Sequence, residues 1–376
     1  MAASESGRSV ILLDEQAELG GGLLHDIRST VDGVAVDEWL KRTLTLLRSR
    51  NNVVLLARAT AFGYYNHNHI AIVERVTDHL TNPPDHLPRE RLWQVRAGHV
   101  VLATGAHERP LVFADNDRPG IMLAESVRAF INRYAVVPGG RIVFATNGAS
   151  AYQAAADAIE AGIEVMLIDV RRESACGPEV ADLRARNVQV ITGHTIVGST
   201  GRKRVTGLIV APVNAQGVIG ARRTLACDCV GMSGGWTPAV HLFSQSRGKL
   251  RFDGVIDAFV PGASAQATSS AGACKGTYDL NACLAEGWRL GFEVTGRPVS
   301  PAASAEPTTL QGFVPVRVLP TDGDAARVRA FVDFQNDVTA KDIKLAVLEG
   351  FESVEHVKRY TTTRSEEHTS ELQSPI

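Results

Sequence analysis

The sequence predicts an α/β protein with two dinucleotide-binding, Rossmann-like domains, the second inserted into the first, followed by the start of a small helical domain. Two short apolar runs support this, because each ends in an acidic residue. They are Val10–Leu13 before Asp14 and Val165–Ile168 before Asp169. An acid at the end of the second strand of a βαβ unit accepts hydrogen bonds from the adenosine ribose.

Composition restricts the function classes. The chain has 376 residues, of which 44% are hydrophobic and 21% charged, with a formal net charge of −2. This composition is typical of an ordinary soluble protein and leaves room for roughly two to three domains. It gives no reason to expect a nucleic-acid partner, and no apolar run is long enough for a membrane span. The five scattered cysteines predict reduced thiols and a cytoplasmic location.

The first domain begins with the strand Val10–Leu13, followed by Asp14, Glu15 and the triplet Gly20–Gly22. A first strand with a G-x-G-x-x-G turn belongs about 20 residues earlier, and the polar octet Met1–Arg8 stands in its place. We therefore expect the phosphate-binding half of this site to be missing. The isolated chain should then bind NAD weakly or not at all.

Further elements of the first domain follow in order. Leucines at helical spacing predict an amphipathic helix over 37–47. Apolar runs predict a strand at 53–57 and strands at 69–76, 92–96 and 99–103, the last entering an Ala-Thr-Gly turn. We expect the strands at 10–13, 53–56 and 99–103 to share one sheet. The Ala/Ser/Gly-rich stretch 262–276 and the helix after it resemble a segment that places a helix N-terminus over a dinucleotide.

The second βαβ unit contains the strand Arg141–Ala145, a turn, an alanine-rich helix and the strand ending at Asp169. Asp169 lies about 20 residues after Gly148, the spacing of a ribose-binding acid. Thr146, however, replaces the glycine that makes the tight turn. We expect the fold to be kept and pyrophosphate binding to be impaired.

These patterns predict domain boundaries. The first dinucleotide-binding domain comprises 9–138 and 226–298, and the inserted second domain comprises 139–225. A Pro/Ala/Ser-rich linker at 299–325 leads to a partial helical domain at 326–363, which opens with a capping-box variant at Thr339–Asp342. Residues 364–376 look like a translated sequencing adapter and are excluded from fold reasoning.

Several segments resemble the α subunit of heterotetrameric sarcosine oxidase, whose fold is of the FAD/NAD(P)-binding oxidoreductase type. They are Gly20–Leu24, Ala61–Tyr65, Gly105–Pro110, Asn116–Met122, Ala330–Ile343, Glu349–Phe351 and Ser353–Thr361. The resemblance covers about Ser9 to Thr363. It implies a complex that oxidatively demethylates sarcosine to glycine, passes the one-carbon unit to tetrahydrofolate as 5,10-methylenetetrahydrofolate, and forms H2O2.

The resemblance also implies cofactors and partners. NAD is held by this subunit, FAD by the β subunit, and FMN lies at the α/β interface. The partners are the β, γ and δ subunits. The implied NAD contacts are Asp14, Glu15, Gln16, Gly22, Ala61, Ala273, Tyr278 and Leu280. Gln16 and Tyr278 depart from the family's usual residue types, so any contact there rests on the backbone.

Two alternatives remain open. One is a different two-dinucleotide-fold oxidoreductase subunit, such as an opine dehydrogenase subunit that binds FAD in place of NAD. The other is a non-catalytic scaffold that holds a nucleotide. No residue of this chain is predicted to be catalytic and no metal site is expected. The chain alone is therefore expected to be inactive.

Overall fold

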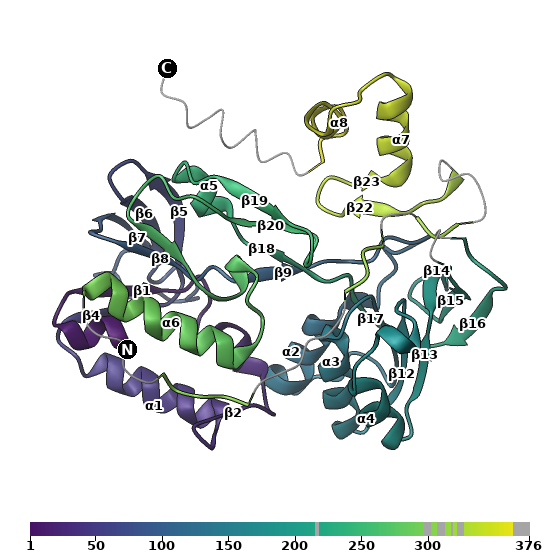
Figure 1. Cartoon of the computed structure of the whole chain (residues 1–376), viewed down its shortest axis with the longest axis horizontal. Helices are drawn as coiled ribbons and strands as arrows, with labels where there is room; N and C mark the ends of the chain where they lie inside the picture. Colours follow the sequence, from purple (N-terminus) through teal and green to yellow (C-terminus); the bar gives the residue numbers. More distant parts are fainter. Residues whose placement is uncertain (215–217, 297–301, 307–312, 317–318, 322–326, 364–376) are drawn as a thin grey trace. The chain divides into compact units, whose positions relative to one another are not determined.

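The structure is a computed structural model that describes residues 1–214, 218–296, 302–306, 313–316, 319–321 and 327–363. It divides into two compact units. The first comprises Met1–His107 and Trp236–Leu310, and the second Glu108–Gly235 and Gln311–Ile376. Figure 1 shows the helices and strands of both units.

The first unit begins with a β-α-β motif. β1 (Val10–Leu13) pairs in parallel with β4 (Val53–Leu56), and α1 (Val36–Arg48) connects them. The connection is helical because parallel neighbours need a crossover, and the leucines of α1 supply an apolar face. The predicted helix and both predicted strands are present.

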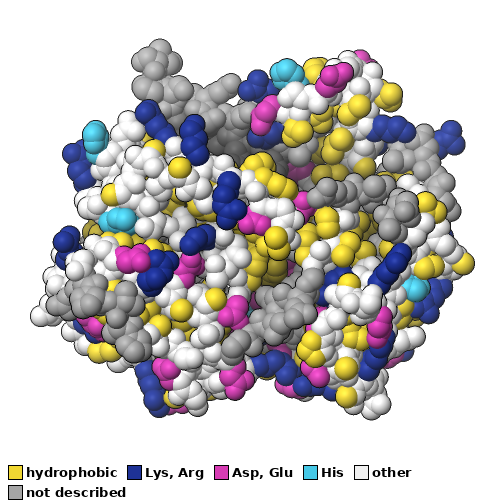
Figure 2. All heavy atoms as spheres, viewed as in Figure 1, with side chains coloured by type: hydrophobic (Ala, Val, Ile, Leu, Met, Phe, Trp, Pro, Cys, Tyr) yellow, Lys and Arg dark blue, Asp and Glu magenta, His cyan; other side chains and the backbone are white. Residues whose placement is uncertain are grey.

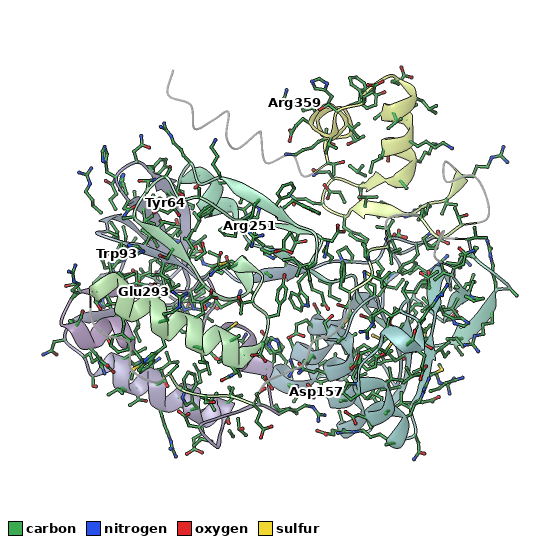
Figure 3. All side chains as sticks on the ribbon, viewed as in Figure 1. Tyr64, Trp93, Asp157, Arg251, Glu293 and Arg359 are labelled. Atoms are coloured by element: carbon green, nitrogen blue, oxygen red, sulfur yellow. The ribbon has the colours of Figure 1, made fainter. Side chains whose placement is uncertain are left out.

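An antiparallel meander follows. β5 (Ala59–Tyr65), β6 (His69–Arg75) and β7 (Glu90–Arg96) form one sheet, with a bulge between Ala61 and Gly63. Tyr64, which is labelled in Figure 3, is 1% exposed, and its hydroxyl donates to Asn68 Oδ1 at 2.8 Å. This polar pair is satisfied inside the apolar core of the unit.

The expectation that β8 shares a sheet with β1 and β4 was wrong. β8 (Val100–Leu102) pairs in parallel with β21 (Thr268–Ser270), and β1–β4 forms a separate two-stranded sheet. In the described part of the chain no strand links the two pairs. Several apolar side chains of these strands are half-exposed, namely Ile11, Leu12, Val54 and Val101 at 38%, 40%, 43% and 45%.

The remaining elements of the first unit connect or cover these sheets. They are η1 (Ala2–Ser6), η2 (Gly21–His25), β2 (Thr30–Val31), β3 (Val34–Ala35), β18 (Trp236–Pro238), α5 (His241–Gln245), β19 (Leu250–Asp253), β20 (Ala258–Pro261), η4 (Gly272–Lys275) and α6 (Leu280–Thr295). β9 (Ala106–Glu108) lies where the chain passes from the first unit to the second.

The second unit is built on a parallel sheet of order β10-β17-β11-β12-β13. The strands are β10 (Ile121–Leu123), β11 (Arg141–Thr146), β12 (Glu164–Asp169), β13 (Gln189–Thr192) and β17 (Cys229–Ser233). Alternate residues of β11 point to opposite faces: Ile142 and Phe144 to one core, Val143 and Ala145 to the other. Both faces of the sheet are therefore buried, as parallel sheets require.

Different layers cover the two faces of this sheet. The helices α2 (Ala124–Tyr134), α3 (Ser150–Glu160) and α4 (Glu179–Ala185) contribute to one core. The antiparallel strands β14 (His194–Thr200) and β15 (Gly207–Pro212) contribute to the other, and β16 (Arg223–Ala226) and η3 (Glu173–Ala175) complete this part. The α/β fold class predicted from the sequence is confirmed.

The C-terminal part contains β22 (Phe331–Asp333), β23 (Val338–Thr339), α7 (Ala340–Leu348) and α8 (Val354–Thr361). Thr339 and Asp342 form the predicted capping box at the start of α7. The loop before β10 is hydrogen-bonded to this part of the chain. Asn116 Nδ2 donates to the Phe331 carbonyl at 2.9 Å, and Asn116 Oδ1 accepts the Phe331 amide at 2.8 Å.

The unit boundaries differ from the predicted domain boundaries. The second unit starts at Glu108, before the predicted Gly139, because β10 and β17 belong to the sheet of β11. Residues 364–376 and most of the predicted linker lie outside the described residues.

Candidate dinucleotide-binding site

The carboxyl end of β1 presents the predicted acidic segment. The Asp14 amide donates to the Leu56 carbonyl at 2.9 Å, which extends the parallel pairing by one residue. Asp14 Oδ1 accepts the Gln16 amide at 2.9 Å, so this carboxylate is held in one orientation. Within the described residues, Oδ2 accepts no hydrogen bond. It is therefore available to the hydroxyls of a ribose.

Glu15 and Gln16 are exposed and contribute backbone contacts. The Glu15 carbonyl accepts a hydrogen bond from the Arg75 guanidinium at 2.8 Å, and the Gln16 carbonyl accepts the Arg58 amide at 2.7 Å. The Ala59 amide donates to the Asp14 carbonyl at 2.9 Å. The acidic segment is thus joined to the start of β5, the strand that carries the partly buried Ala61.

The glycine triplet has two different roles. At Gly20, φ is +146° and a Cβ would lie 2.6 Å from Leu40 Cδ2, so this position requires glycine to pack on α1. At Gly22 a Cβ would meet nothing within 4 Å. The backbone at Gly22 therefore borders open space, which fits the close approach of a ligand.

The late segment runs through η4 into α6. Ala273 lies in η4, Tyr278 packs near Trp236 with ring centroids 6.5 Å apart, and Leu280 is the first residue of α6. Asp279 caps α6 by accepting the Ala282 amide at 2.8 Å.

An apolar cluster joins two of the predicted segments. Leu280 and Leu23, which follows Gly22, both pack against Val31, Val36 and Ala305. Asp14–Gln16 and Ala61 form a second group through the start of β5. Ala273 and Tyr278 lie in the segment that leads into α6. Every candidate residue nevertheless belongs to the first unit.

Sequence reasoning missed Ser270, the last residue of β21. Its Oγ is buried and makes no hydrogen bond within the described residues. It immediately precedes the segment that carries Ala273. An unsatisfied hydroxyl beside a predicted ligand segment fits a polar group of a bound nucleotide. No sequence pattern marked it, because serine is frequent throughout this stretch.

In the second unit, the acid at the ribose position is used internally. Asp169 is fully buried and pairs with the Arg171 guanidinium, Nη2 to Oδ2, at 2.7 Å. Its Oδ2 also accepts the Tyr152 hydroxyl at 2.8 Å, and its Oδ1 accepts the Arg171 amide at 2.8 Å. Asp169 therefore has no oxygen directed to a ligand.

The turn after β11 is also closed by the chain itself. The Thr146 hydroxyl donates to the Gly148 carbonyl at 2.9 Å and accepts the Gly148 amide at 3.1 Å. That amide is one of the donors that a pyrophosphate would use in a glycine-rich turn. The turn is thus satisfied by the chain itself, and impaired pyrophosphate binding there stays a prediction.

Two known proteins have sequences similar to that of this chain over nearly its whole length. The chain is 39% identical over 370 residues to sarcosine oxidase subunit alpha of Corynebacterium sp. (strain P-1), covering 96% of this chain and 38% of that protein. It is also 39% identical over 369 residues to the subunit of the same name from Rhizobium meliloti (strain 1021), covering 96% and 36%. The chain belongs to the family of sarcosine oxidase α subunits. It thus spans less than two-fifths of the length of these relatives.

Two further comparisons concern one segment of the chain and its fold, respectively. The family model for the sarcosine oxidase A3 domain matches residues 327–370. L-Proline dehydrogenase from P. horikoshii has a similar fold, with a TM-score of 0.68 and 19% identity, covering 96% of this chain and 66% of that chain. At this identity the likeness supports the fold alone.

Among the described residues, no group of three or more His, Cys, Asp or Glu side chains is arranged to hold a metal ion. The described helices include none with the length and apolar character of a membrane span. On the face shown in Figure 2, acidic and basic side chains are interspersed.

Proposed function

We propose that this chain is the NAD-holding part of the α subunit of a heterotetrameric sarcosine oxidase. The observation that carries the proposal is the acidic end of β1. There Asp14 is fixed by the Gln16 amide with Oδ2 left open, and Gly22 borders open space. Asp14 would bind the adenosine ribose, and the backbone at Gly22 would approach the cofactor. Glu15, Gln16, Ala61, Ala273, Tyr278 and Leu280 complete the proposed contact set.

The proposed role of NAD in this subunit is structural, and the chemistry belongs to the complex. Sarcosine is oxidised with FAD in the β subunit, FMN at the α/β interface carries electrons to oxygen, and H2O2 forms. The one-carbon unit reaches tetrahydrofolate as 5,10-methylenetetrahydrofolate. This assignment makes the β, γ and δ subunits the partners. All five cysteines are free thiols, which favours a reducing compartment.

The test uses the full-length α subunit that contains this sequence, purified with its partner subunits and then denatured to release nucleotides. We expect NAD in the wild type and at least a ten-fold lower NAD content in Asp14→Asn. Asparagine keeps the oxygen that accepts the Gln16 amide, so the turn is preserved while the charge is lost.

The matched control is Asp37→Asn, on the exposed face of α1, where Asp37 pairs with Lys41 at 3.0 Å. It should leave the NAD content unchanged. If FAD, rather than NAD, is the nucleotide lost from Asp14→Asn, this site binds a flavin and the proposal fails. Formation of sarcosine-dependent H2O2 by the complex tests the substrate assignment separately.

A further inference from the structure

The sheet of the second unit has a topological switch point that is placed where such folds bind ligands. From β11 the chain proceeds to β12 and β13 on one side, whereas β17 and β10 lie on the other. In open α/β sheets the ligand crevice lies outside the carboxyl ends of the two strands at this point. Here those strands are β11 and β17, followed by Asn147 and Gly234.

A short segment of the same chain occupies this crevice. The Val314 amide donates to the Asn147 carbonyl at 3.0 Å. The Phe313 ring centroid lies 5.0 Å from the guanidinium carbon of Arg109. A Cβ at Gly235 would lie 2.4 Å from Cε2 of Phe313, so the aromatic ring fills the space that glycine leaves.

Two groups that would bind a nucleotide at this crevice are already committed. The Thr146 hydroxyl satisfies the turn, and Asp169 is paired with Arg171 and Tyr152. A nucleotide would have to displace the peptide and also break a fully buried ion pair. An extended peptide needs neither group, because it uses the Asn147 carbonyl and a ring-sized space beside Arg109.

A second contact holds the chain beyond this segment. Asn116 is 2% exposed and binds the Phe331 backbone through both its amide nitrogen and its oxygen. The Asp115 amide also donates to the Arg329 carbonyl at 2.7 Å. Val314, Arg329 and Phe331 are therefore all held on the second unit.

We propose that the switch-point crevice of the second unit is a peptide-docking site, which binds Phe313 and Val314 of its own chain in place of a nucleotide. Its recognition chemistry is an aromatic side chain on a guanidinium, followed by a backbone amide that pairs with the turn carbonyl. The second unit thus anchors the C-terminal part of the chain, and it takes no dinucleotide.

Hydrogen exchange followed by mass spectrometry tests this on the full-length subunit. In the wild type the Val314 amide should exchange at least ten-fold more slowly than the same sequence in an unstructured peptide. Phe313→Ala should speed that exchange at least ten-fold and leave the β11 amides unchanged. The matched control Phe252→Ala removes a phenylalanine that is 53% exposed in the first unit, and should leave Val314 protected.

Millimolar NADP serves as the nucleotide probe. We expect it to leave exchange across 147–150 unchanged, because the crevice is filled. Either of two results overturns the proposal: a Val314 amide that exchanges in the wild type as fast as in an unstructured peptide, or protection of 147–150 by NADP. The wild-type measurement decides the first point even if Phe313→Ala fails to fold.

Discussion

Arg171 and Asp169 form an ion pair, 2.7 Å from Nη2 to Oδ2, in which both side chains are completely buried. The Tyr152 hydroxyl and the Glu179 carboxylate also contact the pair, at 2.8 Å from Asp169 Oδ2 and 3.0 Å from Arg171 Nη2, respectively. Burial, followed by the Asp169 carboxylate, raises the pKa of Tyr152, so this hydroxyl remains a hydrogen-bond donor. The ribose position of the second unit is therefore part of its core.

Arg171→Met should destabilise the second unit strongly. It leaves Asp169 buried without its cation, a change that costs about 3–5 kcal/mol. Chemical denaturation of the full-length subunit measures the effect. The neighbouring exposed Arg172→Met is the control and should change stability by less than about 0.5 kcal/mol. Equal effects of the two substitutions would contradict the role assigned to the pair.

Asn116→Ala should loosen the C-terminal part of the chain. The substitution removes both hydrogen bonds to the Phe331 backbone and should cost about 1–3 kcal/mol. Limited proteolysis should cut the variant faster between 313 and 331. Asn336→Ala removes an exposed asparagine that bonds locally to Asp333 at 3.1 Å, and should not change the rate. Unchanged cleavage in Asn116→Ala would refute the anchor.

Glu108 should make stability fall with rising pH. Burial raises the pKa of this carboxyl from 4.5 to about 7, although it accepts the Glu125 amide at 2.9 Å. Because the pKa of Glu108 is higher in the folded than in the unfolded state, its protonated form favours folding. This contribution to the free energy of unfolding, about 3 kcal/mol, is fully present below pH 4.5 and is lost as the pH rises from 4.5 to about 7.

Glu108→Gln should remove that slope, because glutamine stays neutral and still accepts the Glu125 amide. Denaturation midpoints between pH 4.5 and 8 measure it. Glu164→Gln, at a side chain 58% exposed, should retain the wild-type slope. Parallel curves for wild type and Glu108→Gln would show that Glu108 is not the group responsible.

Substitutions at Gly20 and Gly22 should have different effects, the first on stability and the second on NAD binding. Gly22→Ala places its methyl in open space, so it should keep the stability and lower the NAD occupancy of the full-length subunit several-fold. Gly20→Ala should destabilise the first unit, since its φ is +146° and the methyl would clash with Leu40. The two variants are compared by thermal unfolding and nucleotide extraction. Similar behaviour of both would contradict the distinction.

The sequence predicted where strands lie better than it predicted which strands pair with each other. Apolar runs placed β1, β4, β11 and β12 correctly, because strands of parallel sheets consist of nearly continuous apolar segments. The pairing of β8 with β21 could not be read from the sequence. It joins strands more than 160 residues apart, and periodicity carries no information on which distant strand is the neighbour.

The candidate site was predictable to a similar degree. Asp14 and the glycine triplet stand out by residue type and spacing. Ser270 does not, because only the structure shows that its hydroxyl lacks a partner. For the second unit, Thr146 indicated an impaired turn. The spacing of Asp169 argued for a ribose ligand until the structure placed Arg171 and Tyr152 against it.

The Asp169–Arg171 pair also limits how the second unit can change over evolutionary time. Either residue altered alone leaves the other as an isolated buried charge, so both single-step routes pass through a poorly folded protein. A lineage carrying this pair would need coordinated replacements before the ribose position could face a ligand again. A ribose-binding acid at this position is therefore difficult to reach by single substitutions.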